Sequence, residues 1–166
     1  AKIKGLDWSN LAARIAPEMR IDAHPEWVVS EFRARYPEDS PEQLFHRIVT
    51  AARSWRGQVE EADARARSGR NNTFVYQLDF EQAKHTDDIG LAFGTLPNPT
   101  PAQTKMSERM MDAFIRFAKT GNPGWAHYGT KARQTMVFDT ASRVINNPRK
   151  WERELFAKIP YVQPGT

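Results

Sequence analysis

The sequence of 166 residues contains no cysteine, which excludes disulfide bonds, thiolate metal ligands and a cysteine nucleophile. It also lacks any apolar run near the roughly 20 residues of a membrane-spanning helix, so we expect no membrane partner. Large apolar side chains are scarce, because Leu, Ile, Val and Phe together make up about a fifth of the residues. The modest net charge of +4 and the five tryptophans nevertheless favour a folded chain with a thin core.

Positive charge is nowhere concentrated enough to indicate a nucleic-acid partner. Lys and Arg number 24 against 20 Asp and Glu, and acidic residues lie between the basic ones. The one local excess, at Arg65, Arg67 and Arg70, is also typical of a solvated helix end. We therefore expect no nucleic-acid partner, and a gel shift that disappears with modest salt would identify any binding as non-specific.

The first half of the chain is predicted to be helical. Residues 7–16 and 25–36 have helical patterns, and Pro17 and Pro37 end them. The next helix has the strongest signal, because Ser40 begins a capping box with a first-turn proline. Apolar residues then recur every three or four positions until Gly69, which predicts one buried stripe along the helix. The stripe consists of Phe45, Ile48, Val49, Ala52, Trp55, Val59, Ala62 and Ala66.

The second half mixes strands and helices. Residues 73–80 are rich in β-branched and aromatic side chains without clear alternation, which predicts a strand covered on both sides. Residues 101–120 predict a helix with a core face of Met and Phe, and residues 148–158 a final, mostly polar helix. Residues 135–139 and 143–146 predict two short strands around a tight turn. Three short strands cannot form a covered parallel sheet, so we expect further strands to lie outside this chain.

Histidine is the residue type here that best suits acid–base chemistry, and position separates the four. His24 precedes a proline, His46 lies beside the apolar stripe and His127 lies in a loop, so we expect structural or solvated roles for them. None has a second histidine at the spacing of a helical metal site, and we expect no metal. His85 follows the strand at 73–80 on a loop, where a general base can project into a cleft. An ordinary loop histidine is the alternative.

Three stretches in the second half of the sequence form a recognisable pattern. They are His85-Thr86-Asp87-Asp88-Ile89 with Phe93-Gly94-Thr95, then Met110 to Phe114 with Phe117 to Pro123, and finally Trp125, Tyr128 and Thr135 to Asp139. Together they resemble the catalytic-histidine loop, the following helix and the closing strand of type B carboxylesterases, the α/β-hydrolase family that includes the cholinesterases. The helices before Thr73 are similar to that family's helical insertion.

The resemblance implies an α/β fold, the C-terminal part of an α/β-hydrolase, mostly helical with about three short strands. Residues 1–70 would form the helical region, and residues 71–166 the histidine-loop strand, helix and closing strands. It also implies hydrolysis of a small-molecule carboxylic ester without a cofactor, with His85 as general base and acid and Asp88 supporting it nearby. Asp87 and Asp88 as caps of the following short helix are the alternative.

The family's order of catalytic residues implies that this chain holds only part of the machinery. The nucleophilic serine and the acid precede the histidine in such enzymes, and no Gly-x-Ser-x-Gly motif occurs in this sequence. We therefore expect an N-terminal remainder of the hydrolase domain as partner, and no activity from this chain alone. Two departures stand out: the stretch between Phe80 and His85 is short and lacks Gly and Pro, and Gly90 replaces a common proline.

A different class of function is also compatible with the sequence. The chain would then be a non-catalytic helical interaction module derived from the end of an esterase, whose apolar stripe binds a partner helix. A start codon at or near Ala1 would favour the module, whereas an upstream reading frame with the serine motif would favour the esterase.

Overall fold

The computed structural model describes residues 3–69, 72–84 and 86–160, and the chain divides into two units. Unit 1 is Ala1–Glu61 with Arg149–Thr166, and unit 2 is Ala62–Pro148. The expected boundary near residue 70, between a helical region and a region with strands, does not coincide with this division. The last helix belongs to unit 1 because its apolar residues pack against the first helices. Each unit is described by itself below.

Unit 1 is built from helices. The first begins later than the predicted residue 7, because the Asp7 carboxylate accepts hydrogen bonds from the backbone N–H groups of Ser9 and Asn10 and holds a turn there. Its elements are α1 (Leu11–Ile15), η1 (Ala16–Glu18), α2 (Pro25–Arg35), α3 (Pro41–Val49), η2 (Thr50–Trp55), the first part of α4 (Arg56–Arg67), and α7 (Lys150–Phe156).

The predicted capping box at the start of α3 is confirmed. The Ser40 hydroxyl accepts a hydrogen bond from the backbone N–H of Gln43 at 3.3 Å, and the side-chain oxygen of Gln43 accepts one from the backbone N–H of Ser40 at 2.8 Å. The helical path then continues through η2, which is π-helical, to the end of α4. Beyond η2 the predicted stripe is confirmed only in part, since π-type bonding shifts the helical phase. Ala62 is buried as predicted and Val59 and Ala66 are half-buried, but the charged Arg56 and Asp63 of α4 are buried too.

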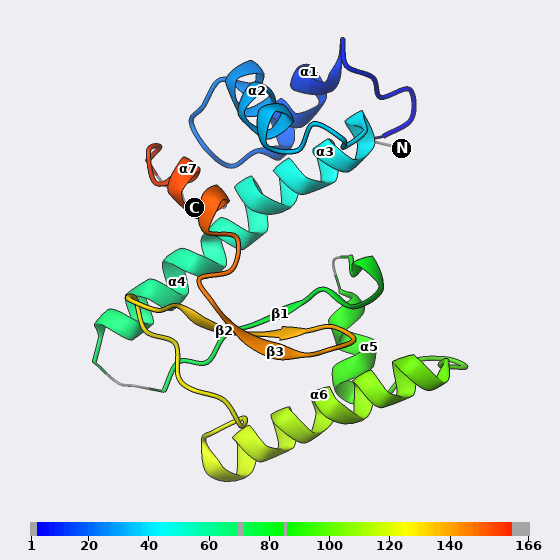
Figure 1. Ribbon diagram of the computed structural model, residues 1–166, viewed down its shortest axis with the longest axis vertical. Coiled ribbons are helices and arrows are strands. Elements are labelled where there is room, and N and C mark those ends of the chain that lie inside the picture. The colour runs from blue at the N-terminus through cyan, green and yellow to red at the C-terminus, as the bar shows by residue number, and fades with distance from the viewer. Residues whose placement is uncertain (1–2, 70–71, 85, 161–166) are drawn as a thin grey trace. The chain divides into compact units, whose positions relative to one another are not determined.

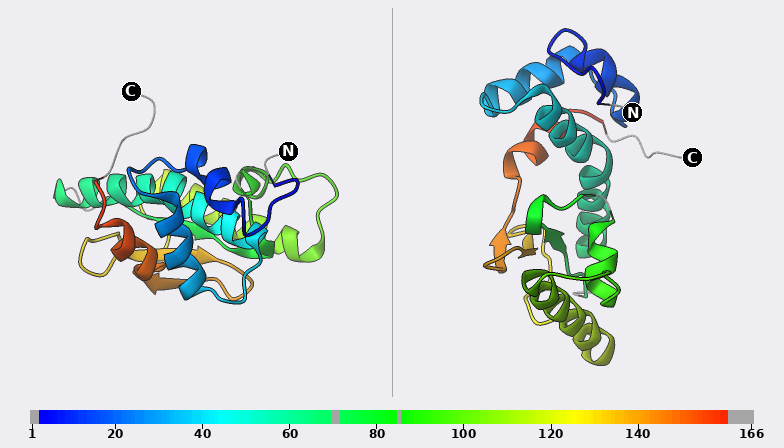
Figure 2. Two further views of the ribbon diagram at one scale, coloured as in Figure 1. Left: turned by 90° about the horizontal axis from the view of Figure 1, so that it is seen from above. Right: turned by 90° about the vertical axis from the view of Figure 1, so that its right-hand side faces the viewer.

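The core of unit 1, called core 1, brings α7 against α2 (Figure 1, Figure 2). The ring of Phe32 in α2 meets that of Trp151 edge-on at 4.9 Å and lies 6.0 Å from that of Phe156. The stripe residues Phe45, Ile48 and Ala52 also belong to core 1, so this part of the stripe is not free to bind a partner helix. The buried members of core 1 are Leu11, Ile15, Met19, Val28, Phe32, Leu44, Phe45, Ile48, Ala51, Ala52, Leu155, Phe156 and Ile159.

Unit 2 contains a three-stranded sheet in the order β1-β2-β3. β1 (Tyr76–Leu78) runs parallel to β2 (Gln134–Phe138), and β3 (Arg143–Asn146) runs antiparallel to β2. The strand predicted at 73–80 is therefore shorter than expected, and its residues are half-buried because it lies at the edge of the described sheet. The central strand β2 is the one buried on both faces, with Val137 and Phe138 each 2% exposed.

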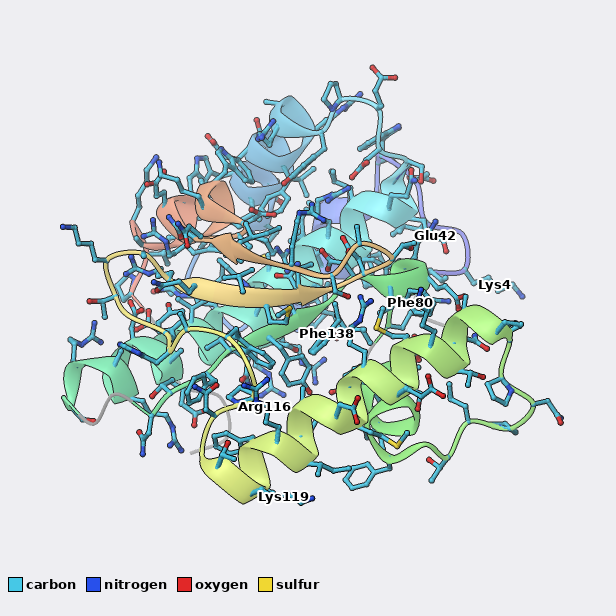
Figure 3. All side chains as sticks on the ribbon, turned by 60° about the horizontal axis from the view of Figure 1, so that its bottom comes forward. Lys4, Glu42, Phe80, Arg116, Lys119 and Phe138 are labelled. Carbon is cyan, nitrogen blue, oxygen red and sulfur yellow. The ribbon has the colours of Figure 1, made fainter. Side chains whose placement is uncertain are left out.

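Two helices cover one face of this sheet and form the second core, called core 2. α5 (Asp87–Phe93) packs beside α6 (Pro101–Thr120). Met106 and Met110 of α6 are buried as predicted, whereas Phe114 and Phe117, predicted on the same core face, are exposed. Phe80 and Phe138 lie between the sheet and α6 (Figure 3). The buried members of core 2 are Phe80, Leu91, Met106, Met110, Ala113 and Phe138. Core 2 thus fixes α5, the helix that follows the predicted catalytic loop.

Candidate active site

The predicted catalytic residue, His85, lies outside the described residues, and so does Arg70. The surroundings of His85 are therefore built from the residues on either side. The chain enters from β1 through the short helical turn η3 (Phe80–Gln82) and leaves into α5. Phe80 is buried in core 2, which anchors the entry to the loop.

The backbone on both sides of the loop adopts a conformation that residues other than glycine rarely adopt. Glu81, Gln82 and Thr86 have φ angles of 51°, 54° and 78°. A β-branched side chain such as that of Thr86 is especially unfavourable in this left-handed region. Such residues persist only where their surroundings hold them, and they cluster at functional sites.

Side-chain hydrogen bonds tie this strained segment to its neighbours. The Asp87 carboxylate accepts a hydrogen bond from the backbone N–H of Lys84 at 2.7 Å, so the residues described before and after position 85 are joined. Further upstream, the Gln103 side chain at the start of α6 donates to the Glu81 carboxylate at 2.8 Å. Side-chain hydrogen bonds thus hold the described residues on both sides of position 85.

Asp88, the predicted supporting residue, pairs with a tyrosine that the sequence reasoning missed. The Tyr76 hydroxyl donates to the Asp88 carboxylate at 2.8 Å. Burial, followed by the hydrogen bond and the charge of Asp88, raises the pKa of Tyr76 well above its ordinary value. Thr86, rather than Asp87 or Asp88, is the N-cap residue of α5. The role of Asp88 beside His85 remains a prediction.

The second half of the loop motif has a direct packing explanation. The Ser107 hydroxyl of α6 donates to the Leu91 carbonyl at 2.7 Å and holds α5 against α6. α5 ends at Gly94, where φ is 64° and where a Cβ atom would lie 2.9 Å from the Met111 sulfur. Only glycine satisfies both the left-handed conformation and the close approach of α6.

The other titratable candidates do not gather into a site. His24, His46 and His127 are exposed, as expected. In residues 3–69, 72–84 and 86–160, no three His, Asp or Glu side chains lie together as metal ligands would. Among the same residues, no helix combines the length and apolar character that crossing a membrane requires.

A second buried polar group, formed by Asp63, Tyr128 and Arg133, also escaped the sequence reasoning. The Asp63 carboxylate accepts hydrogen bonds from the Tyr128 hydroxyl at 2.7 Å and from the Arg133 guanidinium at 2.9 Å. Burial and the carboxylate raise the pKa of Tyr128. The backbone N–H of Tyr128 also donates to the Thr73 carbonyl at 2.6 Å. The Asp63, Tyr128 and Arg133 group thus holds the segments that lead into β1 and β2.

Solved structures place this architecture in the α/β-hydrolase class. The carboxylesterase EST55 of Geobacillus stearothermophilus matches with a TM-score of 0.76 and 24% identity, over 91% of this chain and 35% of its own. A structure of PNB esterase matches with a TM-score of 0.63 and 25% identity, over 88% of this chain and 32% of its own. The chain therefore has part of an α/β-hydrolase fold, which confirms the predicted fold class.

The sequence comparison adds a likeness to an esterase. The para-nitrobenzyl esterase of Bacillus subtilis (strain 168) is 27% identical over 139 residues, which are 72% of this chain and 28% of that enzyme. No protein-family model matches the chain. The resemblance to type B carboxylesterases is confirmed by these relatives. This chain spans about a third of the length of the relatives it matches.

Proposed function

We propose that this chain is the C-terminal portion of a carboxylic-ester hydrolase and supplies its catalytic histidine, His85. The observation that carries the proposal is the match to carboxylesterases in both fold and sequence. The strained, hydrogen-bonded segment on either side of position 85 supports it, because such backbone is typical of catalytic loops.

In the proposed reaction, His85 accepts the proton of a serine hydroxyl as the serine oxygen attacks the ester carbonyl. The imidazolium then gives that proton to the departing alcohol, which leaves an acyl-serine. A water molecule attacks the acyl group in the second half of the reaction, again with His85 as base and then acid. A carboxylate orients the imidazole, and no cofactor takes part. The serine and this carboxylate are contributed by a further part of the hydrolase domain.

Two features of unit 2 support the need for that further part. β1 is an edge strand of the described sheet, and an edge offers its backbone groups to another strand. Ile89, Phe93 and Ile115 are also 53%, 74% and 50% exposed, which is unusual for large apolar residues on two neighbouring helices. The proposed remainder of the domain covers these surfaces.

The test compares this chain with the longest reading frame that contains it, assayed with p-nitrophenyl acetate. We expect this chain alone to hydrolyse the ester no faster than free imidazole, because loss of a triad nucleophile costs about a million-fold in turnover. The longer protein should show saturable hydrolysis that His85→Ala lowers by roughly four orders of magnitude or more. His127→Ala is the control. Activity of the longer protein that survives His85→Ala would refute the proposal.

A further inference from the structure

We propose that Tyr76 is a positioning residue for the ester hydrolysis, acting through Asp88 to hold the segment that carries His85. This inference rests on the proposed function. Tyr76 touches neither substrate nor reacting atoms in this account. Its hydroxyl instead fixes where the loop ends, and thereby the position from which the histidine works.

The hydrogen bond between Tyr76 and Asp88 joins two described residues that lie on either side of position 85 in the chain. Tyr76 lies in β1 and Asp88 in the first turn of α5, and the donor and acceptor are 2.8 Å apart. The chain between them includes the end of β1, the turn η3 and the first residue of α5. A bond between the two ends therefore limits every conformation that the loop can adopt.

Tyr76 is a firm anchor for such a bond. Its backbone pairs with Met136 in the parallel register of β1 and β2. Its ring packs edge-on against Phe114 at 5.7 Å and Phe138 at 5.8 Å, which are residues of α6 and β2. The hydroxyl is thus placed by a strand, a helix and core 2 together, and Asp88 is held by groups that do not belong to the loop.

The start of α5 depends on the bond between Tyr76 and Asp88, because its own N-cap residue contributes no side-chain hydrogen bond. Thr86 occupies the N-cap position with φ at 78° and forms no side-chain capping bond. The Asp87 carboxylate bonds back to Lys84 and so closes only the inner turn. The bond from Tyr76 is directed to a carboxylate, the stronger class of hydrogen bond, and joins α5 to the sheet.

The decisive variant is Tyr76→Phe, which removes the hydroxyl and keeps the ring contacts. Its matched control is Tyr128→Phe, which removes an equivalent bond to Asp63 elsewhere in unit 2. In this chain, we expect Tyr76→Phe to raise amide hydrogen exchange at residues 86–91 about tenfold, and Tyr128→Phe to leave those amides unchanged. In the longer protein, Tyr76→Phe should lower kcat about tenfold with KM within about twofold, since a small misplacement of a catalytic group costs rate.

A double-mutant cycle tests whether Tyr76 acts through Asp88. Asp88→Ala should match Tyr76→Phe in both measurements, and the double variant should be no worse than either single variant. Asp88→Asn still accepts the tyrosine hydrogen bond, so it should retain most of the protection. If Tyr76→Phe does not fold, the comparison of Asp88→Ala with Asp88→Asn tests the same hydrogen bond. Additive effects, or unchanged exchange in Tyr76→Phe, would overturn the inference. If Tyr76→Phe raises exchange at residues 86–91 as expected but the longer protein shows no His85-dependent hydrolysis, the proposed function is rejected and the contact between Tyr76 and Asp88 remains supported.

Discussion

At the scale of single residues, three tyrosine hydroxyls in the described part of the chain donate to carboxylates, and each joins segments that are distant in the sequence or in different elements. Tyr36 pairs with Glu152 in unit 1, and the other two pairs, of Tyr76 and Tyr128, lie in unit 2. Burial is the main cause that raises the pKa of each hydroxyl, and the carboxylate adds to it. All three tyrosines therefore favour the protonated form in the folded protein.

The raised pKa of Tyr128 makes stability depend on pH in the alkaline range. Below the unfolded-state pKa of about 10, the tyrosine is protonated in both states and its contribution is complete. Above it, the unfolded state loses the proton and the folded state does not, so the free energy of unfolding falls by up to about 1.4 kcal/mol per pH unit. Urea unfolding from about pH 8 to 11.5 should show the advantage of wild type over Tyr128→Phe shrinking above about pH 10. A constant difference would contradict the assignment.

Because the backbone at Thr86 is strained, a glycine there should stabilise the protein, whereas most substitutions destabilise it. Glycine adopts a positive φ without a steric cost, so Thr86→Gly should raise the free energy of unfolding by up to about 1 kcal/mol. Thr104→Gly, in ordinary helical backbone of α6, should lower it by a similar amount. Chemical denaturation of the two variants measures both changes. Destabilisation by Thr86→Gly would mean that contacts of the threonine side chain outweigh the strain.

At the scale of elements, the capping boxes of α3 and α6 are the clearest local determinants. At the start of α6, the Thr100 hydroxyl accepts a hydrogen bond from the backbone N–H of Gln103 at 3.2 Å. The Ser40 hydroxyl accepts the corresponding bond at the start of α3. Ser40→Ala and Thr100→Ala should each lower the free energy of unfolding by about 1 kcal/mol. Ser30→Ala on an exposed position of α2 should change it by less than about 0.5 kcal/mol. Equal effects of all three would show that capping is not the cause.

Local signals of this kind account for what could be predicted from the sequence. The helix beginning at Ser40 and the helix ending at Gly121 follow from residues within one turn of each boundary. The length of β1 could not be predicted, because it depends on pairing with β2, whose partner residues lie sixty positions later. The burial of Asp63 likewise depends on Tyr128, which lies in a distant loop.

The candidate site shows the same limit. The family resemblance indicates Asp88, and the place of His85 after a strand together with that resemblance indicates His85. The sequence predicts only a strand at Tyr76, because no local pattern links a strand tyrosine to an aspartate twelve residues later. The contact arises from the way α5 packs beside β1, which is a property of the fold.

At the scale of the whole molecule, residues 3–69, 72–84 and 86–160 form two hydrophobic cores whose buried members do not overlap. Phe32→Ala should cost unit 1 about 3–5 kcal/mol, and Met110→Ala should cost unit 2 about 2–5 kcal/mol, because both side chains are fully buried. Hydrogen exchange followed by mass spectrometry should show each loss mainly in the unit that holds the substituted residue. Equal loss of protection in both units from either substitution would indicate a single cooperative unit.

The position of β1 at the edge of the sheet has a practical consequence for handling this chain. The strand Tyr-Gln-Leu carries no charge, whereas the other edge strand, β3, begins with Arg143. Charged residues at an edge discourage pairing between molecules, and uncharged edges invite it. Solutions of this chain should therefore become turbid with increasing concentration, and a lysine in place of Gln77 should keep them clear.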